Sequence, residues 1–240
     1  MIELIKFIMC LSQIYGHVFG EPMRIHNLED KNTVINYFTS ELRDINIQND
    51  PMRFRNNIER IGQMLSYEIS QTLSYSKQSV TTPLGVKEVN LIDEKLVVAS
   101  ILRAGLPLHN GVLSVFDRAE NCFVSAYRKY RDANNFTIHV EYLVLPELDD
   151  KTVILCDPML ATGSSMEVAY NAILSKSKPK RVIICSIVAS EQALDYINKT
   201  LGDKVSDLFV ATVDPSLDAH SYNVPGIGDA GDLAFGAKLD

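Results

Sequence analysis

The chain has 240 residues, of which 46% are hydrophobic and 22% are charged, as is typical of a globular protein with a sizeable core. Its formal net charge of -7 argues against a general binder of nucleic acids or membrane surfaces. The 4 cysteines are widely separated, so no metal-binding spacing is present, and we expect reduced thiols in a cytoplasmic setting.

The N-terminal segment differs from the rest of the chain. Its apolar run from Phe7 to Leu11 is too short to cross a membrane, and Glu3 stands where a signal peptide carries positive charge. We interpret residues 1–22 as a poorly ordered extension and residues 23–240 as the folded domain.

Two stretches after this extension carry apolar residues at helical spacing. Residues 27–44 predict a short amphipathic helix, and a longer helix is predicted from Pro51 to Leu73, because proline is favoured in the first helical turn. The arginines of the longer helix, such as Arg53 and Arg55, lie mostly on its other faces. We expect those faces to be solvated.

Apolar runs and helical patterns alternate over the rest of the chain. Strands are predicted at 95–102, 121–127, 153–156, 180–189 and 207–214, and helices at 108–116, 166–174 and 191–201. Residues 81–94 are polar with a turn at Pro83, and residues 136–145 alternate like one strand of a hairpin or a flexible arm. The alternation predicts an α/β fold with a doubly wound, mostly parallel sheet flanked by helices.

The stretch from Val153 to Met166 contains the clearest candidate site. A buried strand runs into Asp157 and Pro158, and a small, hydroxyl-rich turn then leads into a helix. Ligands bind at such junctions in parallel sheets, where backbone amides and hydroxyl groups suit a phosphate. Asp157 suits a ribose hydroxyl or a metal. The alternative is an ordinary strand, turn and helix in which serine and threonine act only as caps.

A second candidate lies near the C-terminus, where residues 225–232 combine three glycines, a proline and two carboxylates. We predict that this run forms no regular structure. It could be an ordinary surface loop, but glycines let backbone amides and carbonyls approach a ligand closely. We therefore favour a binding loop built on a rigid sheet.

Several segments together resemble the uracil phosphoribosyltransferase family of type I phosphoribosyltransferases. Residues 157–165 (Asp-Pro-Met-Leu-Ala-Thr-Gly-Ser-Ser) resemble its motif for phosphoribosyl pyrophosphate (PRPP), and residues 101–106 its pyrophosphate loop. Tyr127-Arg128 resembles the strand end before a flexible arm, and residues 222–232 the uracil-binding tail. Phe235-Gly-Ala-Lys resembles the family's C-terminal ending. Matching segments in the right order are stronger evidence than a single motif.

The resemblance implies a role for each matching residue and a small hood formed by terminal segments and a flexible hairpin arm. The implied catalytic residues are Arg103, Arg128 and Asp229. The implied PRPP-binding residues are Arg103, Arg128, Asp157, Pro158, Met159, Leu160, Ala161, Thr162, Gly163, Ser164, Ser165 and Asp229. The implied uracil-binding residues are Asn223, Gly228, Asp229 and Ala230. Asp229 would also approach Mg²⁺, held mostly through PRPP.

The activity implied by the resemblance is transfer of phosphoribose from PRPP to uracil, giving UMP and pyrophosphate in pyrimidine salvage. The expected cofactor is Mg²⁺, and the expected assembly is a homodimer or homotetramer with GTP as a candidate effector. A phosphoribosyltransferase for another base and an RNA-binding pyrimidine regulator are the alternatives. Ser164 and Asn223 depart from the family pattern, which has a glycine and an apolar residue there.

Overall fold

The computed structural model describes residues 22–130 and 136–239, and the side chains of residues 126–139 lie outside the description. The prediction that residues 1–22 form a poorly ordered extension concerns residues almost entirely outside this range. Within the described range, no helix is long and apolar enough to span a membrane.

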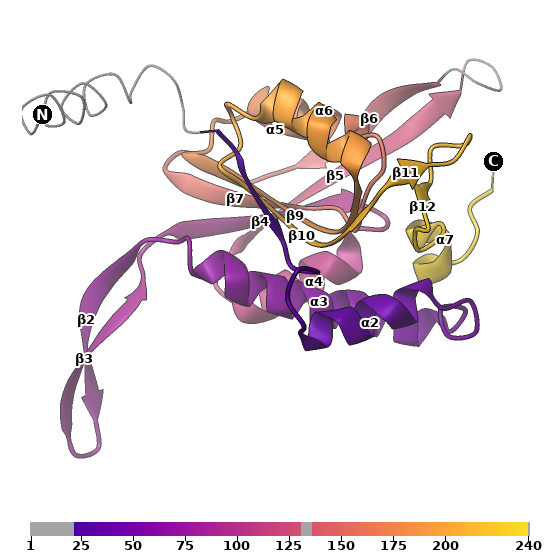
Figure 1. Ribbon diagram of the computed structural model, residues 1–240. Helices are drawn as coiled ribbons and strands as arrows, with labels where there is room; N and C mark the ends of the chain where they lie inside the picture. Colours follow the sequence, from indigo (N-terminus) through magenta and orange to yellow (C-terminus); the bar gives the residue numbers. More distant parts are fainter. Residues whose placement is uncertain (1–21, 131–135, 240) are drawn as a thin grey trace, which may run out of the picture.

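A central sheet organises the molecule (Figure 1). Its strands lie in the order β1 (Arg24–Asn27), β10 (Asp207–Asp214), β9 (Arg181–Ser190), β7 (Lys151–Cys156), β4 (Lys95–Leu102), β5 (Glu120–Tyr130) and β6 (Phe136–Val144), while β8 (Met159–Leu160) also pairs with β9. Every pairing is parallel except that of β5 with β6. The prediction of a mostly parallel sheet is confirmed.

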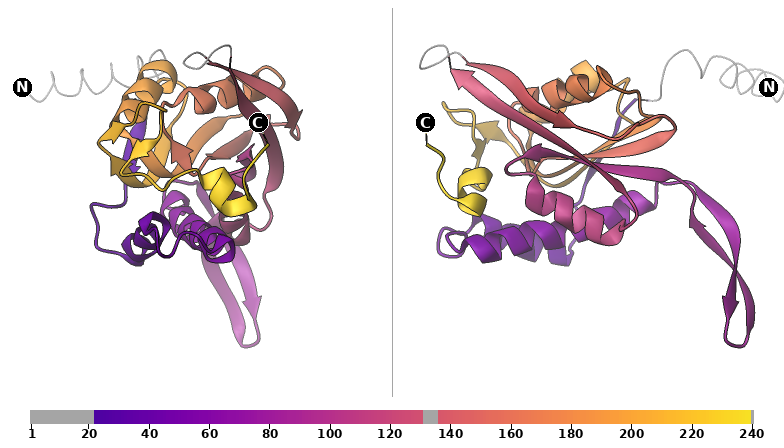
Figure 2. Two further views of the ribbon diagram at one scale, coloured as in Figure 1. Left: turned by 90° about the vertical axis from the view of Figure 1, so that its right-hand side faces the viewer. Right: turned by 180° about the vertical axis from the view of Figure 1, so that it is seen from behind.

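Helices cover both faces of the sheet, as predicted (Figures 1 and 2). One face carries α2 (Val34–Arg43), α3 (Pro51–Ser70) and α4 (Leu106–Val115), and the other carries α5 (Ser164–Leu174) and α6 (Glu191–Leu201). Neighbouring residues of β4 show the pleat, because Val98 packs with the first group and Val97 with the second. Both residues are fully buried.

Two helix starts follow from capping. The Asp50 side chain accepts hydrogen bonds from Met52 N and Arg53 N, so α3 begins at Pro51, as predicted. The helix predicted at 27–44 is shorter than expected: Asn27 ends β1, and α2 begins only after its cap Thr33. Strand β1 escaped prediction because its sequence has no apolar run; it is ordered by pairing with β10.

The polar stretch around Pro83 is also more regular than its sequence suggested. It forms a hairpin of β2 (Tyr75–Thr82) and β3 (Gly85–Ile92), which pair only with each other. The hairpin projects from the body as an arm (Figure 1). The predicted turn at Pro83 is its tip.

A second small hairpin and a short helix close one end of the sheet. The hairpin consists of β11 (Ser216–Leu217) and β12 (Asn223–Val224), and the helix is α7 (Ala230–Phe235). The prediction that residues 225–232 lack regular structure is therefore wrong at its end. Asp229 caps α7 by accepting a hydrogen bond from Asp232 N, and this capping interaction starts the helix inside the glycine-rich run.

Candidate active site

A cleft of about 1160 Å³ lies where β4 and β7 end, beside the C-terminal tail. The left view of Figure 2 looks onto this end of the molecule, where α7 lies beside α3. The predicted residues that line the cleft are Arg103, Asp157, Met159, Leu160, Ala161, Thr162, Gly163, Ser165, Asp229 and Ala230. Three segments far apart in the sequence thus meet at the C-terminal edge of a parallel sheet.

The loop from β7 to α5 has the shape of a phosphate cradle. Gly163 precedes α5 with a φ of 79°, a left-handed conformation that favours glycine. A Cβ atom there would approach Tyr196 Cδ1 to 3.0 Å, because α6 supports the loop from behind. The Thr162 and Ser164 hydroxyl groups lie 2.6 Å apart and bond to each other. Ser165 and Thr162 line the cleft, whereas Ser164 does not.

Pro158 has a supporting position. Its carbonyl oxygen accepts hydrogen bonds from Val188 N at 3.0 Å and Ile187 N at 3.3 Å, which fasten the loop to β9. The proline itself is not among the cleft-lining residues. Of the predicted PRPP-binding residues, Pro158 and Ser164 are therefore placed to shape the loop.

Asp157 is a buried carboxyl group on the cleft wall. Burial raises its pKa to about 7 from an ordinary 3.8, against the opposing effect of a long hydrogen bond of 3.4 Å from Met159 N. Because the protein gives this carboxylate only a long hydrogen bond, hydroxyl donors of a ligand would stabilise its charged form. Its position suits a sugar hydroxyl group.

Arg103 follows β4, and its side chain is 45% exposed. Its Nη2 donates to Asp232 Oδ1 at 2.9 Å, and its Nη1 donates to the Gly236 carbonyl at 3.3 Å. The turn after it is tight, because a Cβ atom on Gly105 would lie 2.5 Å from Ile101 O. The turn presents a guanidinium group to the cleft, where it is already held by the tail.

Asp229 joins three parts of the tail. It caps α7, accepts a hydrogen bond from Tyr222 Oη at 3.2 Å and lies 3.6 Å from Lys238 Nζ. Burial raises its pKa, but the hydrogen bond from Asp232 N and the Lys238 charge outweigh burial and lower it overall. Asp229 therefore carries a negative charge beside the cleft at neutral pH.

Of the other predicted uracil-binding residues, Ala230 lines the cleft, whereas Asn223 and Gly228 do not. Asn223 is buried, and its Nδ2 donates to Leu160 O at 3.4 Å while its Oδ1 has no hydrogen-bond partner in the structure. Gly228 adopts a φ of 76° but does not line the cleft. Arg128 belongs to β5, where its backbone pairs with Ile138, and its side chain lies outside the described part.

Several polar side chains that line the cleft were not predicted as site residues, among them Asp232, Lys238 and Ser125. Asp232 was visible as the second carboxylate of the glycine-rich run. No local pattern indicated that it would pair with Arg103, which is 129 residues away.

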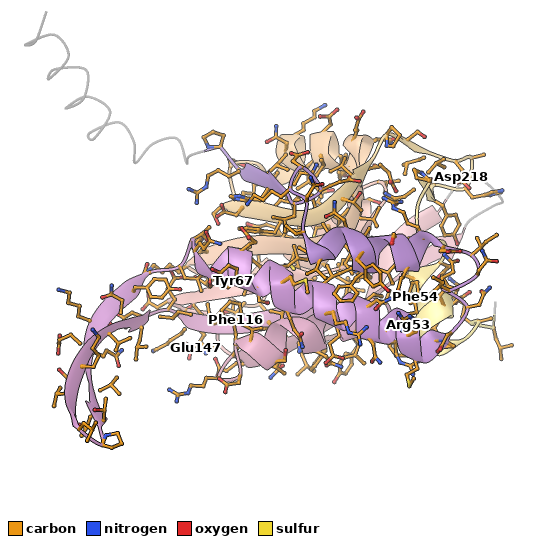
Figure 3. The ribbon with its side chains drawn as sticks, turned by 60° about the horizontal axis from the view of Figure 1, so that its bottom comes forward. Arg53, Phe54, Tyr67, Phe116, Glu147 and Asp218 are labelled. Carbon is orange, nitrogen blue, oxygen red and sulfur yellow. The ribbon has the colours of Figure 1, made fainter. Side chains whose placement is uncertain are left out.

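The expectation that the helix arginines are solvated holds for Arg53, which is exposed, whereas Arg55 is half-buried. Arg55 Nη1 donates to Ala234 O at 2.6 Å and so holds α7, and Arg53 pairs with Glu41 of α2. Figure 3 shows Arg53 and Phe54 near one end of α3 and Tyr67 nearer the other. Arg55 therefore connects α3 to the tail, and Arg53 connects α3 to α2.

The fold and cleft together define an α/β protein whose candidate ligand site lies at the C-terminal edge of a parallel sheet. The family model for uracil phosphoribosyltransferase matches residues 29–237. The chain is 53% identical to a uracil phosphoribosyltransferase of Porphyromonas gingivalis over 217 residues, covering 90% of this chain and 100% of that protein. The chain belongs to the uracil phosphoribosyltransferase family.

More distant relatives agree. A uracil phosphoribosyltransferase of Methanothermobacter thermautotrophicus is 38% identical over 193 residues, with coverage of 80% of this chain and 87% of the relative. Among solved structures, the AQ2163 protein of Aquifex aeolicus superposes with a TM-score of 0.79 at 31% identity, covering 90% of this chain and 100% of that one. The similarity therefore spans nearly the whole described fold.

Proposed function

We propose that this protein transfers phosphoribose from PRPP to uracil, releasing UMP and pyrophosphate. The observation that carries the proposal is the meeting of three segments in one cleft: the Thr162–Ser165 loop, Arg103 and the tail around Asp229. The loop would bind the 5-phosphate, Arg103 would bind the leaving pyrophosphate, and the tail would bind the base. Relatives named uracil phosphoribosyltransferase support the choice of reaction.

The phosphate end of the substrate is assigned to the loop before α5. Its backbone amides and the hydroxyl groups of Thr162 and Ser165 would bind the 5-phosphate at the helix N-terminus. Asp157 would accept hydrogen bonds from the ribose hydroxyl groups. Together these contacts fix the sugar before the reaction, and such positioning supplies a large part of enzymatic rate enhancement.

The leaving group is assigned to Arg103 and Arg128. Breaking the bond from C1 to pyrophosphate builds positive charge on the ribose and negative charge on the leaving oxygens. A guanidinium group suits those oxygens because its planar donors bind two of them at once. Stabilising the developing charge lowers the barrier to cleavage. No nucleophilic side chain is needed for this reaction.

Mg²⁺ is the proposed cofactor. The described residues contain no cluster of three or more histidine, cysteine, aspartate or glutamate side chains that could hold a metal. Asp229 and Asp232 both line the cleft, and hard carboxylate oxygens combined with phosphate oxygens are a usual ligand set for Mg²⁺. These residues fit a metal that arrives with PRPP, where it would neutralise charge on the pyrophosphate.

The base is assigned to the tail. Asp229 and Ala230 line the cleft, while the turn at Gly228 and the buried Asn223 support them from behind. Backbone groups of this turn would read the edge of uracil. Asp229 is engaged as a helix cap and by Tyr222, so we give it an orienting role and leave the proton acceptor unassigned.

Assembly into a homo-oligomer is part of the proposal. The β2–β3 arm carries exposed apolar side chains, including Val86 at 70% and Leu84 at 100% exposure. A two-stranded hairpin is marginally stable alone in water, so an arm of this kind is best stabilised on another subunit.

A cytoplasmic location is supported by the free, buried thiols of Cys122, Cys156 and Cys185. GTP regulation stays an expectation from the family.

The test is an assay of the purified protein with PRPP, Mg²⁺ and a panel of bases. Pyrophosphate release and nucleotide formation are measured together. We expect both products with uracil and neither with orotate or purines. Turnover of another base in preference to uracil, or RNA binding without UMP formation, would contradict the proposal.

A further inference from the structure

The tail that carries the proposed base site is held by an ion pair behind it. Arg43 is the last residue of α2, and Asp214 is the last residue of β10. Arg43 Nη2 lies 2.7 Å from Asp214 Oδ1, and Arg43 Nη1 lies 3.4 Å from Asp214 Oδ2. The Asp214 side chain is 2% exposed and that of Arg43 is 23% exposed. The pair is therefore a largely buried, two-point contact.

Both backbone polar groups of Gly226 bond to this pair. Gly226 N donates to Asp214 Oδ2 at 3.0 Å, and Gly226 O accepts from Arg43 Nη1 at 2.9 Å. The glycine has a φ of 67°, and a Cβ atom there would lie 2.1 Å from Asn223 O. The Asn223 carbonyl thus leaves no room for a side chain at Gly226, and the charged side chains of Arg43 and Asp214 hold its backbone.

The pair is itself part of a satisfied network. Arg43 Nη2 also donates to Thr212 Oγ1 at 3.0 Å, and Thr212 Oγ1 donates to Glu29 Oε2 at 2.5 Å. A buried network of this kind fixes its members when every group has a partner. Asp214 does not line the cleft, and both of its oxygens are engaged by Arg43 and Gly226.

We infer that Arg43 and Asp214 are positioning residues that set the affinity for the base by fixing the turn at Gly226. This inference rests on the proposed function. Gly226 precedes the cleft-lining residues Asp229 and Ala230 by only a few positions, and Ile227 between them is anchored in the core. Most of the predicted PRPP-binding residues, from Asp157 to Ser165, lie on a separate support, the junction of β7 and α5. Loosening Gly226 should therefore weaken the binding of uracil more than that of PRPP.

The test compares Arg43→Lys with the matched control Arg53→Lys. Arg53 also forms a two-point pair with a buried carboxylate, Glu41, but it does not touch the tail. Lysine keeps the positive charge at position 43 but lacks the fork that reaches Asp214, Thr212 and Gly226 together. We expect Arg43→Lys to raise the KM for uracil about tenfold, with the KM for PRPP changed by less than about twofold. The control should leave both constants near those of the parent.

Amide hydrogen exchange of residues 223–230 provides a readout that needs no activity. We expect about tenfold faster exchange in Arg43→Lys than in the parent and no change in Arg53→Lys. Equal rises in both KM values, or unchanged exchange, would overturn the inference and leave the pair a general structural contact. If the parent makes no UMP, the proposed function fails, while faster exchange at unchanged melting temperature would still support control of the turn by Arg43.

Discussion

Arg103 donates a hydrogen bond to Asp232 over 2.9 Å, so a carboxylate already holds the guanidinium group that we assign to pyrophosphate. Both side chains line the cleft, although they are 129 residues apart in the sequence. A pyrophosphate oxygen that binds Arg103 must compete with this carboxylate. We therefore expect the pair to lower the affinity of the free protein for pyrophosphate.

Removing that competitor should tighten pyrophosphate binding. An ion pair exposed to this extent contributes about 0.2–1 kcal/mol, so Asp232→Asn is expected to lower the Kd for pyrophosphate roughly 1.5- to 5-fold. Calorimetry without divalent cations measures the effect apart from any metal contact. Arg118→Ala, which changes an exposed arginine outside the cleft, is the control. Weaker binding by Asp232→Asn would show that the carboxylate helps to bind the anion.

Arg128→Ala should lose most of its turnover while remaining folded. Removing one group that stabilises developing negative charge typically costs about 10²–10³ in kcat, and we expect a loss of that order. Steady-state assays at saturating PRPP and uracil give the rate, and circular dichroism checks the fold. Near-normal turnover in a folded protein would remove Arg128 from the mechanism.

Asp157 should make stability fall as pH rises. Burial raises its folded-state pKa to about 7 from 3.8, so the folded protein binds this proton more tightly than the unfolded chain does. The free energy of unfolding therefore decreases with pH between these two values and levels off above them. Asp157→Asn should lack this contribution, so it should gain stability relative to the parent at pH 8 and match it at pH 4. Urea titrations across this range provide the measurement. A constant difference at all pH values would show that Asp157 does not titrate there.

Gly163→Ala should damage both the fold and the phosphate cradle. Its left-handed backbone costs a residue with a Cβ atom about 1–2 kcal/mol, and the new atom would approach Tyr196. We expect a lower melting temperature and a raised KM for PRPP. Gly85→Ala is the matched control, because a Cβ atom on Gly85 meets nothing within 4 Å. Equal effects of the two substitutions would argue against a special role for the loop.

A buried cluster at the N-terminal ends of the strands should govern stability without affecting the cleft. Asp207 accepts hydrogen bonds from Arg24 Nε at 2.9 Å and Arg181 Nη2 at 2.6 Å, and it lies 2.9 Å from His26 Nε2. Asp207→Asn leaves these basic groups without their buried charge and should cost about 3–5 kcal/mol of unfolding free energy.

Chemical denaturation of Asp207→Asn tests this value, with Glu120→Gln as the control. Glu120 pairs with Lys151, but it is 50% exposed, so its loss should cost no more than about 1 kcal/mol. Turnover of the remaining folded Asp207→Asn protein should match the parent. A selective loss of PRPP or uracil affinity would contradict a purely structural role.

The elements that could be predicted from the sequence are those with a strong local pattern. The apolar run of β4 and the capped helix α6 both lie where their sequences place them. β1 and the β2–β3 arm could not be found this way, because their residues are mostly polar and their order comes from pairing. Tertiary context overrides local preference in such strands.

The candidate site divides in the same way. Asp157 and the turn at Gly163 are visible locally, since a strand, a turn and a helix follow one another there. Contacts between distant segments are not visible. Arg43 and Asp214 are separated by 171 residues, and nothing in either neighbourhood indicates the partner. Sequence reasoning could thus place the binding segments but not the ionic contacts that hold the tail.

The pairing of β1 with β10 has a consequence for biosynthesis. Arg24 and Asp207 are 183 residues apart, so at about 5–20 residues per second a ribosome adds Asp207 roughly 10–40 s after Arg24. During this interval the edge strand β1 has no β10 with which to pair. The tail that completes the cleft is translated later still. In a nascent chain, the candidate cleft is therefore complete only after the tail around Asp229 has been synthesised.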